Sequence, residues 1–241
     1  MRWLVTGASG QLGGYLLRHL RNRGEEVVAW SGTARGEVCG VSLQVVDLTD
    51  TASMPVPFHD ARPEAVIHAA AMARVDECYR DPKRARRVNV DATARLAELA
   101  AEAGVRFAYV STDLVFDGER APYRETDPPQ PLSAYGHTKA DGETAALAAP
   151  RSVVARVSLL FGPTLTGRPG FFDGLIASLR EGGPVTMFAD EWRTPLAMPA
   201  AAAALVEIAR SDFAGIVHVG GPDRLSRLEM GQCIADHLGA S

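Results

Sequence analysis

Residues 6–13 of the chain are Thr6-Gly7-Ala8-Ser9-Gly10-Gln11-Leu12-Gly13, and this stretch decides the fold. An apolar run precedes it at residues 2–5, and apolar residues at helical spacing follow it from residue 15 to residue 20. The pattern predicts a strand, a glycine turn and a helix. The first two glycines would let a pyrophosphate approach the backbone, and Gly13 would let the helix pack closely on the strand. Because free N–H groups at a helix start bind anions, we expect a doubly wound parallel α/β sheet with a dinucleotide at this turn. The alternative is a tight turn without a ligand.

The second predicted strand, residues 26–30, ends without the acidic residue that would bind the ribose hydroxyls of NAD. Ser31 and Thr33 follow it instead, together with Arg35. Small hydroxyl groups and a guanidinium suit the additional 2'-phosphate of NADP. The sequence therefore favours NADP(H), with NAD(H) as the alternative if Arg35 is only a solvated loop residue.

Two further predicted strands end at the ligand-binding edge of such a sheet. Residues 43–46 are followed by Asp47-Leu48, and residues 65–67 are followed by His68 and then by three alanines at 69–71. The small side chains would let a cofactor lie against the backbone. We expect His68 to be a hydrogen-bonded histidine at a strand end rather than a catalytic residue.

A tyrosine and a lysine stand four residues apart at the predicted start of a helix, Tyr135 and Lys139. That spacing places both side chains on one helix face. A phenol titrates near ~10, so it transfers protons at neutral pH only with help from a neighbour such as an ammonium. The chain has 25 Lys and Arg residues, yet only Lys83 and Lys139 are lysines, which favours a specific use of Lys139. The alternative is a surface tyrosine beside a solvated lysine.

The predicted strand at residues 107–110 ends in Ser111-Thr112-Asp113. A hydroxyl there could bind the oxygen of a carbonyl that is being reduced. The turn-rich segment 116–129 that follows could carry substrate contacts.

Composition and charge exclude several classes of protein. The formal net charge is −4, which argues against a nucleic-acid footprint. The three cysteines and six histidines show no metal-ligand spacing, so we expect no metal site and no disulfide framework. No signal peptide or membrane segment is evident, and we expect a cytoplasmic protein.

The rest of the chain predicts a second, smaller unit. We expect a long helix from Asp81 to Gly104 that carries Asn89, a short strand at residues 185–188, and helices that begin at Phe171, Pro199 and Ser226. Trp192 could stack on a base or sugar and Arg193 could bind a diphosphate, although structural packing is an equal alternative for Trp192. The predicted division is a dinucleotide-binding Rossmann domain at residues 1–157, with a returning strand near 214–220, and a mainly substrate-binding lobe at residues 158–241.

Taken together, these motifs resemble the extended short-chain dehydrogenase/reductases. The resemblance rests on the glycine turn, on Asp47-Leu48, on Ser111-Thr112-Asp113 with Phe116-Asp117-Gly118, and on Tyr135-x-x-x-Lys139. Gly10-Gln11-Leu12-Gly13 and the run 111–143 resemble the dTDP-4-dehydrorhamnose reductase branch most closely.

The resemblance implies roles for particular residues. Tyr135 would be the general acid, Lys139 would lower its pKa and hold the nicotinamide ribose, Thr112 would orient the substrate carbonyl, and Asn89 would stand behind them in a proton relay. The residues expected to bind the cofactor are Gly7, Ser9, Gly10, Gln11, Leu12, Gly13, Ser31, Thr33, Arg35, Asp47, Leu48, Ala69, Ala70, Ala71, Tyr135, Lys139, Val157 and Leu159. The residues expected to bind the substrate are Thr112, Asp113, Val115, Phe116, Trp192 and Arg193.

The expected function is NADPH-dependent reduction of a 4-keto nucleotide-sugar, similar to dTDP-4-dehydrorhamnose, by an enzyme that dimerises through the helix at 81–104 and the helix that carries Tyr135. Two alternatives stay open: a non-catalytic NADP-binding regulatory subunit, like that of methionine adenosyltransferase, and an epimerase or dehydratase of nucleotide-sugars. Leu114 departs from the aromatic residue that the branch usually has after Ser-Thr-Asp. The chain also ends at Ser241, earlier than the resemblance leads us to expect.

Overall fold

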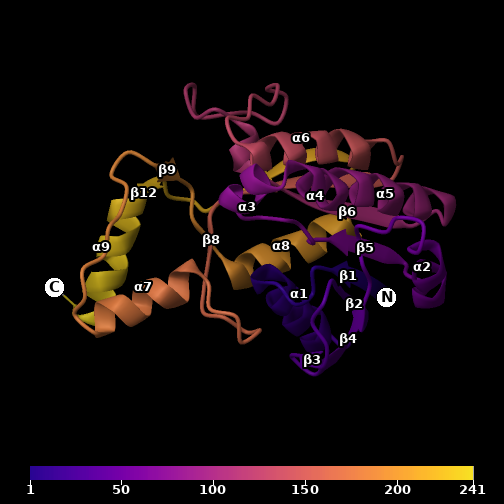
Figure 1. Ribbon diagram of the computed structural model, residues 1–241, viewed down its shortest axis with the longest axis horizontal. Coiled ribbons are helices and arrows are strands. Elements are labelled where there is room, and N and C mark those ends of the chain that lie inside the picture. The colour runs from indigo at the N-terminus through magenta and orange to yellow at the C-terminus, as the bar shows by residue number, and fades with distance from the viewer. Residues whose placement is uncertain (241) are drawn as a thin grey trace.

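The computed structural model describes residues 1–240, and one large sheet forms the centre of the molecule (Figure 1). Its strands are β1 (Arg2–Thr6), β2 (Glu26–Ser31), β3 (Glu37–Val38), β4 (Val41–Val45), β5 (Ala65–His68), β6 (Arg106–Thr112), β7 (Ser152–Val157) and β11 (Gly215–Val219). They lie in the order β11-β7-β6-β5-β1-β2-β4-β3. All neighbouring pairs are parallel except β3 with β4. The prediction of a doubly wound parallel sheet is therefore confirmed.

The strand order changes direction between β1 and β5. The chain extends the sheet from β1 through β2 to β4, then returns to the other side of β1 and continues through β5, β6 and β7 to β11. Open parallel sheets bind ligands at the carboxyl ends of the strands on either side of such a reversal. The glycine turn follows β1 and the alanine run follows β5, so both lie at this point.

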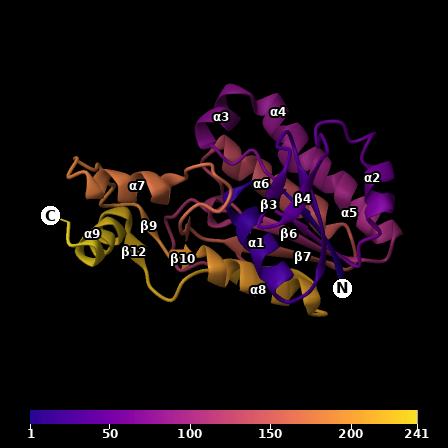
Figure 2. The ribbon, with the colours of Figure 1, turned by 90° about the horizontal axis from the view of Figure 1, so that it is seen from below.

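Helices cover both faces of the sheet (Figures 1 and 2). On one face lie α1 (Gln11–Asn22) and α8 (Met198–Arg210), which also pack on each other. On the other face lie α2 (Pro55–Ala61), α5 (Ala92–Glu102) and α6 (Ala134–Leu147). Figure 1 separates the two helical layers, with α5 and α6 above the sheet and α1 and α8 below it.

The alternation of side chains along each strand builds two separate cores. Trp3 and Val5 pack with α1 and α8, whereas Leu4 between them packs with Phe58 of α2 and Leu96 of α5. Burial of both faces explains why the strands are nearly continuous apolar runs.

The helix predicted from Asp81 to Gly104 forms, but its geometry changes in the middle. It begins as α4 (Pro82–Arg86), widens into a π-helical turn at Arg87–Asp91 and continues as α5. The Asp81 carboxylate accepts a hydrogen bond from the Arg84 amide at 2.9 Å and caps the start, as predicted. The π-helical turn contains Asn89, and such turns are frequent at functional sites.

The C-terminal part of the chain projects beside the large sheet (Figure 1). It contains α7 (Phe171–Arg180) and α9 (Arg227–Leu238), which pack on each other. Two small sheets connect it to the rest of the molecule: β8 (Leu160–Phe161) with β10 (Leu196–Ala197), and β9 (Trp192–Arg193) with β12 (Leu225–Ser226). The capping box predicted from Ser226 and Glu229 begins α9, with hydrogen bonds of 3.1 and 2.8 Å.

The strand predicted at residues 185–188 is wrong, because this segment has no strand to pair with. It runs as coil beside α9, where Met187 packs on Gly231 and the Phe188 carbonyl accepts a hydrogen bond from the Leu228 amide at 3.0 Å. Three short elements were not predicted: α2, the helix α3 (Val75–Arg80) and the edge strand β3. Each is too short to show a clear period in the sequence.

Candidate active site

The glycine turn is formed by close contacts of the backbone. Gly7 has a φ of +68°, and a Cβ there would lie 2.6 Å from the amide nitrogen of Ala70. A Cβ on Gly13 would overlap the carbonyl oxygen of Gly7. Gly10, the residue before α1, provides no side-chain cap for the helix N-terminus. A glycine cradle in front of an uncapped helix N-terminus fits a bound pyrophosphate.

The side chain of Gln11 binds a neighbouring loop. Its Nε2 donates to the Thr164 hydroxyl at 3.2 Å and to the Arg168 carbonyl, and the Tyr15 hydroxyl donates to the Pro163 carbonyl at 2.6 Å. Residues 163–168 therefore lie against the start of α1. Gln11 can offer a cofactor its backbone N–H while its side chain orders this loop. The neighbouring Leu12 is partly buried against the core.

At the end of β2, Arg35 is exposed and has no hydrogen bond or ion pair within residues 1–240. Thr33 is exposed too, whereas Ser31 is buried and its hydroxyl donates to the Ala34 carbonyl at 2.5 Å. The structure thus leaves Arg35 and Thr33 accessible to a ligand and uses Ser31 to shape the turn.

Asp47, after β4, has two cationic neighbours, Arg84 and Arg87, that were not predicted as part of the site. Its carboxylate accepts hydrogen bonds from the amide and hydroxyl of Thr49 at 2.8 and 2.7 Å. These bonds, and then the charges of Arg84 and Arg87, lower the pKa of Asp47. Both arginines come from α4 and the π-helical turn, and their spacing of three residues on a predicted helix could have shown that they share a face. Leu48 is buried in the apolar core, so its side chain contributes packing.

His68 is fully buried between two hydroxyl groups, as expected of a strand-end histidine. Its Nδ1 lies 2.6 Å from the Thr6 hydroxyl and its Nε2 lies 3.0 Å from the Thr93 hydroxyl. The Thr93 hydroxyl also donates to the Asn89 carbonyl at 2.8 Å. Burial, followed by the charge of Lys139, lowers the pKa of His68 to about 3, so the ring is neutral. Thr6 also accepts a hydrogen bond from the Ala70 amide at 3.2 Å, which holds the alanine run beside the glycine turn.

Thr112 and Tyr135 come together where β6 ends and α6 begins. The Ser133 hydroxyl caps α6 by accepting a hydrogen bond from the Gly136 amide at 3.0 Å, and this places Tyr135 in the first turn. Burial, and then the carboxylate of Asp113, raise the pKa of the Tyr135 phenol, while the neighbouring Thr112 hydroxyl opposes this rise. Tyr135 is therefore a neutral phenol at physiological pH, beside a hydroxyl that could bind the same carbonyl oxygen.

Lys139 is buried in the core of the site, with only 2% of its surface exposed. Its ammonium donates to the Val110 carbonyl at 2.7 Å and lies 3.9 Å above the ring of Tyr109. Desolvation lowers the pKa of Lys139 to about 7, and the charge of Glu143 opposes that effect. The ammonium makes no hydrogen bond to the Tyr135 phenol, so it does not offset the effect of burial on the pKa of the phenol.

Asn89 is buried, and its side chain forms hydrogen bonds with Thr138 of α6 and with the backbone of Met72. Its amide donates to the Thr138 hydroxyl at 2.9 Å and to the Met72 carbonyl at 3.1 Å, and its carbonyl oxygen accepts from the Met72 amide at 2.8 Å. Asn89 thus connects the segment after the alanine run to α6. The structure shows it bracing the site, with Thr138 between it and the Tyr135–Lys139 face.

Asp113 and Arg193, predicted to contact the substrate, form an ion pair with each other. The Arg193 guanidinium donates to both Asp113 oxygens, at 2.7 Å from Nε to Oδ2, and to Glu191 at 3.3 Å. The Ser158 hydroxyl donates to Asp113 at 2.7 Å. Sequence spacing could not reveal this pair, because 80 residues separate its members. Each terminal nitrogen of Arg193 carries a second N–H that could reach a diphosphate.

The other predicted substrate and nicotinamide residues differ in accessibility. Val115 and Val157 are buried, whereas Phe116 and Leu159 are partly exposed. Trp192 is 42% exposed, and the Arg224 guanidinium lies 4.2 Å from the centre of its ring. Phe116, Leu159 and Trp192 are therefore the accessible members of this set, whereas the side chains of the two valines are buried.

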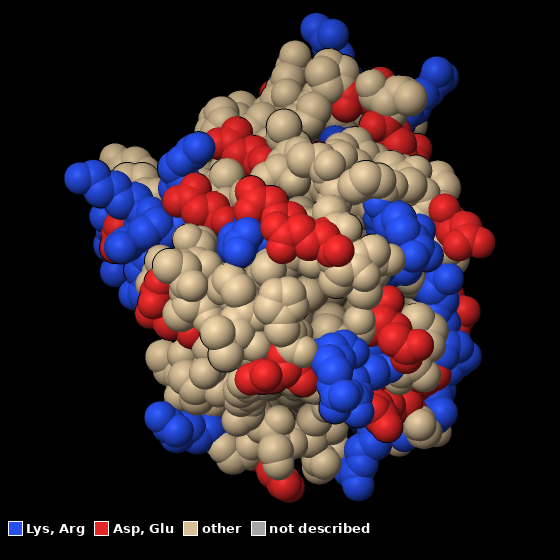
Figure 3. Space-filling model, turned by 90° about the vertical axis from the view of Figure 1, so that its right-hand side faces the viewer, with Lys and Arg blue, Asp and Glu red and all other residues tan. Residues whose placement is uncertain are grey.

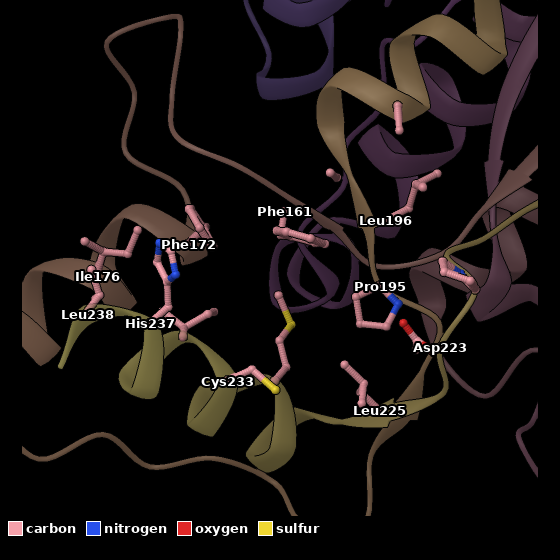
Figure 4. A pocket seen from close by; sticks show the side chains of 15 residues that line it. Phe161, Phe172, Ile176, Pro195, Leu196, Asp223, Leu225, Cys233, His237 and Leu238 are labelled. Atoms are coloured by element: carbon pink, nitrogen blue, oxygen red, sulfur yellow. The ribbon is translucent and has the colours of Figure 1, made fainter. Parts of the chain in front are cut away.

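A cavity of about 620 Å³ lies away from the predicted catalytic residues (Figure 4). Phe172 and Ile176 of α7, Cys233 and His237 of α9, and Phe161 and Leu196 of the small β8/β10 sheet line it. None of the residues predicted to bind cofactor or substrate is part of its wall. It is an apolar cavity of the C-terminal part rather than the site of the predicted chemistry.

Residues 1–240 show neither a metal site nor a membrane-spanning helix. This part of the chain contains no cluster of three His, Cys, Asp or Glu side chains that could hold a metal ion. Its helices are also too short or too polar for a membrane span. On the face drawn in Figure 3, acidic and basic side chains are interspersed.

Several known proteins are similar to this chain in sequence and in fold. A family model described as the RmlD substrate binding domain matches residues 1–241. The beta subunit of methionine adenosyltransferase 2 from Pongo abelii is 32% identical, over 98% of this chain and 71% of the relative. The crystal structure of a hypothetical dTDP-4-dehydrorhamnose reductase from Sulfolobus tokodaii is 34% identical, with a TM-score of 0.88 over 100% of this chain and 83% of that chain. The structure of MoeE5 in complex with UDP-glucuronic acid and NAD is 30% identical, with a TM-score of 0.84 over the same shares.

These similarities confirm the resemblance drawn from the motifs, including its extension over nearly the whole chain. They also confirm the prediction of an NAD(P)-dependent oxidoreductase type, related to nucleotide-sugar reductases. The chain belongs to the family of the RmlD substrate binding domain, within the extended short-chain dehydrogenases/reductases.

Proposed function

We propose that the protein reduces a 4-keto nucleotide-sugar with NADPH. The observation that carries the proposal is that the first turn of α6, which holds Tyr135, packs on the segment directly after Thr112: a Cβ on Gly136 would overlap the Leu114 carbonyl oxygen. Lys139 is buried one turn further along the same helix. Thr112 and Tyr135 would bind the ketone oxygen, and Tyr135 would donate its proton as the negative charge develops. NADPH supplies the hydride for the carbonyl carbon. Lys139 would hold the nicotinamide ribose, and Asn89 would keep α6 in position through Thr138.

The glycine turn and the end of β2 would hold the cofactor. The uncapped start of α1 and the Gly7–Ala70 contact favour a pyrophosphate there. Ala69, Ala71 and the carboxylate of Asp47 would line the dinucleotide, with Ser9 at the turn. The identities of the relatives support a nicotinamide cofactor, and the accessible Arg35 favours the one with a 2'-phosphate.

We expect NADPH to bind about tenfold or more tightly than NADH, because a contact from Arg35 to the additional phosphate contributes about 1.5–3 kcal/mol. Arg35→Ala should remove most of this difference by weakening NADPH alone. Titration of each cofactor by nicotinamide fluorescence measures it. Arg180→Ala, an exposed arginine on α7, is the matched control. A preference for NADH that survives Arg35→Ala would refute the NADP assignment.

For the substrate, we propose that a diphosphate binds at Arg193 while its sugar lies near Phe116 and Tyr135. Arg193→Ala should raise KM for the sugar nucleotide by about tenfold or more and lower kcat less, as loss of uniform binding does. Arg193→Lys should recover part of the affinity, since it keeps the charge without the planar fork. Steady-state kinetics decide it: a fall in kcat with KM unchanged would place Arg193 outside the diphosphate site.

The experiment that tests the function is a panel of keto nucleotide-sugars, dTDP-4-dehydrorhamnose among them, added to protein loaded with NADPH. A stoichiometric loss of nicotinamide absorbance in a single turnover supports the reductase. Conversion of a sugar without net loss of absorbance would instead indicate an epimerase or dehydratase.

The alternative is a regulatory NADP-binding subunit, and the similarity to the beta subunit of methionine adenosyltransferase 2 supports it. Tight NADPH binding without oxidation by any sugar of the panel would favour this second function. This chain has Thr112, Tyr135 and Lys139 under either hypothesis, so kinetics rather than geometry separates the two functions.

Three further predictions concern organisation. We propose the division at residue 157 into a dinucleotide-binding domain and a substrate-binding lobe, with α8 and β11 returning to the large sheet. We also propose a cytoplasmic location and a homodimer through the helix at 81–104 (α4 to α5) and α6. The Arg86–Asp141 ion pair joins α4 to α6 and the Arg95–Glu98 pair lies on α5, so the dimer contact would be partly polar.

A further inference from the structure

A buried ion pair joins α6, the helix that carries Tyr135, to the large sheet. Glu143 lies on α6 one turn beyond Lys139, and Arg156 lies on β7; both are 3% exposed. The Glu143 carboxylate accepts hydrogen bonds from Arg156 at 2.9 Å (Nε) and 2.7 Å (Nη2), and from the Ser111 hydroxyl at 2.5 Å. Ser111 precedes Thr112 on β6. The ion pair therefore contacts both the helix that carries Tyr135 and the strand end that carries Thr112.

The third nitrogen of Arg156 points to the loop 116–132, which projects above α6 in Figure 1. Arg156 Nη1 lies 3.5 Å from the Glu125 carbonyl and 3.4 Å from Nε2 of His218. The guanidinium carbon lies 4.9 Å from the centre of the Phe116 ring. Arg156 therefore contacts the loop at its first residue and again at Glu125.

The loop is anchored at the same two places by neighbouring groups. The Phe116 ring stacks on Tyr123 with a centroid distance of 4.2 Å. The Glu125 carboxylate accepts a hydrogen bond from the His218 amide at 3.1 Å. His218 and Ser111 face Arg156 in the strand register, so all three side chains form one row across β6, β7 and β11.

The energetics of this pair indicate a role in geometry. A buried ion pair gains little net stability over apolar residues, because the desolvation of both charges offsets their attraction. A bidentate arginine does, however, fix the relative position of the groups that it joins. Here those groups are the helix of Tyr135 and Lys139, the strand end of Thr112 and the base of the loop.

We propose that Arg156, held in place by Glu143, is a positioning residue that fixes the loop 116–132 beside Thr112 and so determines how well the sugar nucleotide binds. This inference rests on the proposed function for its kinetic consequence, whereas the fixing of the loop does not. Arg156 reaches the substrate only through Phe116 and the loop.

Kinetics give the first test, with Arg156→Met and Arg156→Lys compared with the parent. We expect Arg156→Met to raise KM for the sugar nucleotide about tenfold, with a change of about threefold or less in kcat and in the KM for NADPH. Arg156→Lys should raise this KM by an intermediate factor, because lysine keeps a positive charge beside Glu143 but loses the nitrogen that contacts the Glu125 carbonyl. Equal changes in both KM values would overturn the proposal.

Proteolysis of the native protein gives the second test and needs no activity. The loop carries two exposed arginines, Arg120 and Arg124, where trypsin can cleave. Release of the loop in Arg156→Met should accelerate cleavage there about fivefold or more, measured by mass spectrometry of the early fragments. Unchanged cleavage in both Arg156 variants would overturn the proposal.

Arg106→Met is the matched control for both tests. Arg106 is also a buried arginine, at the opposite end of β6, where it donates to the Phe213 carbonyl at 2.6 Å. Its replacement should lower the melting temperature without faster cleavage of the loop or a higher KM for the sugar. If no sugar is reduced by the parent protein, the proposed function fails, while faster cleavage in Arg156→Met would still support the positioning of the loop.

Discussion

Replacing Tyr135 with phenylalanine is expected to lower kcat by about 10²–10⁴-fold, the usual loss when a general acid is removed. The variant keeps the aromatic ring and loses only the hydroxyl. Affinity for NADPH should not change, since the cofactor would bind through the glycine turn and Lys139. Single-turnover oxidation of NADPH measures the first quantity and fluorescence titration the second.

The phenol holds the proton that it would donate. Burial and then the Asp113 carboxylate raise the pKa of Tyr135, so the hydroxyl stays protonated throughout the neutral range, and donation would need a cation such as the Lys139 ammonium close enough to lower that pKa. Tyr79→Phe is the matched control, because Tyr79 is 81% exposed on α3. A Tyr135→Phe protein with full turnover would eliminate the assigned mechanism.

Much of the fold could be predicted because its signals are local. The glycine turn lies between an apolar strand and an amphipathic helix, and the structure places it where the strand order reverses. Caps such as Asp81 and Ser226 marked helix starts correctly. The segment 185–188 failed because an apolar run predicts a strand only if a partner strand exists, and partners are a matter of tertiary structure.

The site could be predicted less completely, because its decisive contacts join distant parts of the chain. The spacing of Tyr135 and Lys139 correctly indicated one helix face. It could not show that the ammonium would bind the Val110 carbonyl instead of the phenol. Glu143, four residues after Lys139, could have been found by the same helical spacing. Its partner Arg156 could not, since nothing in a single sequence indicates which buried arginine faces which carboxylate.

Replacing Lys139 with methionine is expected to lower kcat/KM by about 10²–10⁴-fold and, unlike Tyr135→Phe, to weaken NADPH binding as well. Methionine has nearly the length of lysine but no charge, so the packing over Tyr109 is kept while the hydrogen bond to Val110 is lost. Lys83→Met is the matched control, because Lys83 is exposed on α4.

The pH dependence of kcat/KM provides a sharper test of the same residue. Burial lowers the pKa of Lys139 from 10.5 to about 7. The ammonium form predominates below this pKa, so activity that needs the charge is complete in acid and is lost as the pH rises through about 7. His68 cannot produce this change, because its pKa of about 3 keeps it neutral across the range. Lys139→Met should abolish the alkaline fall and leave a low, flat profile. If the variant retained the same fall, another group would be responsible and Lys139 would be reduced to a structural residue beneath Tyr135.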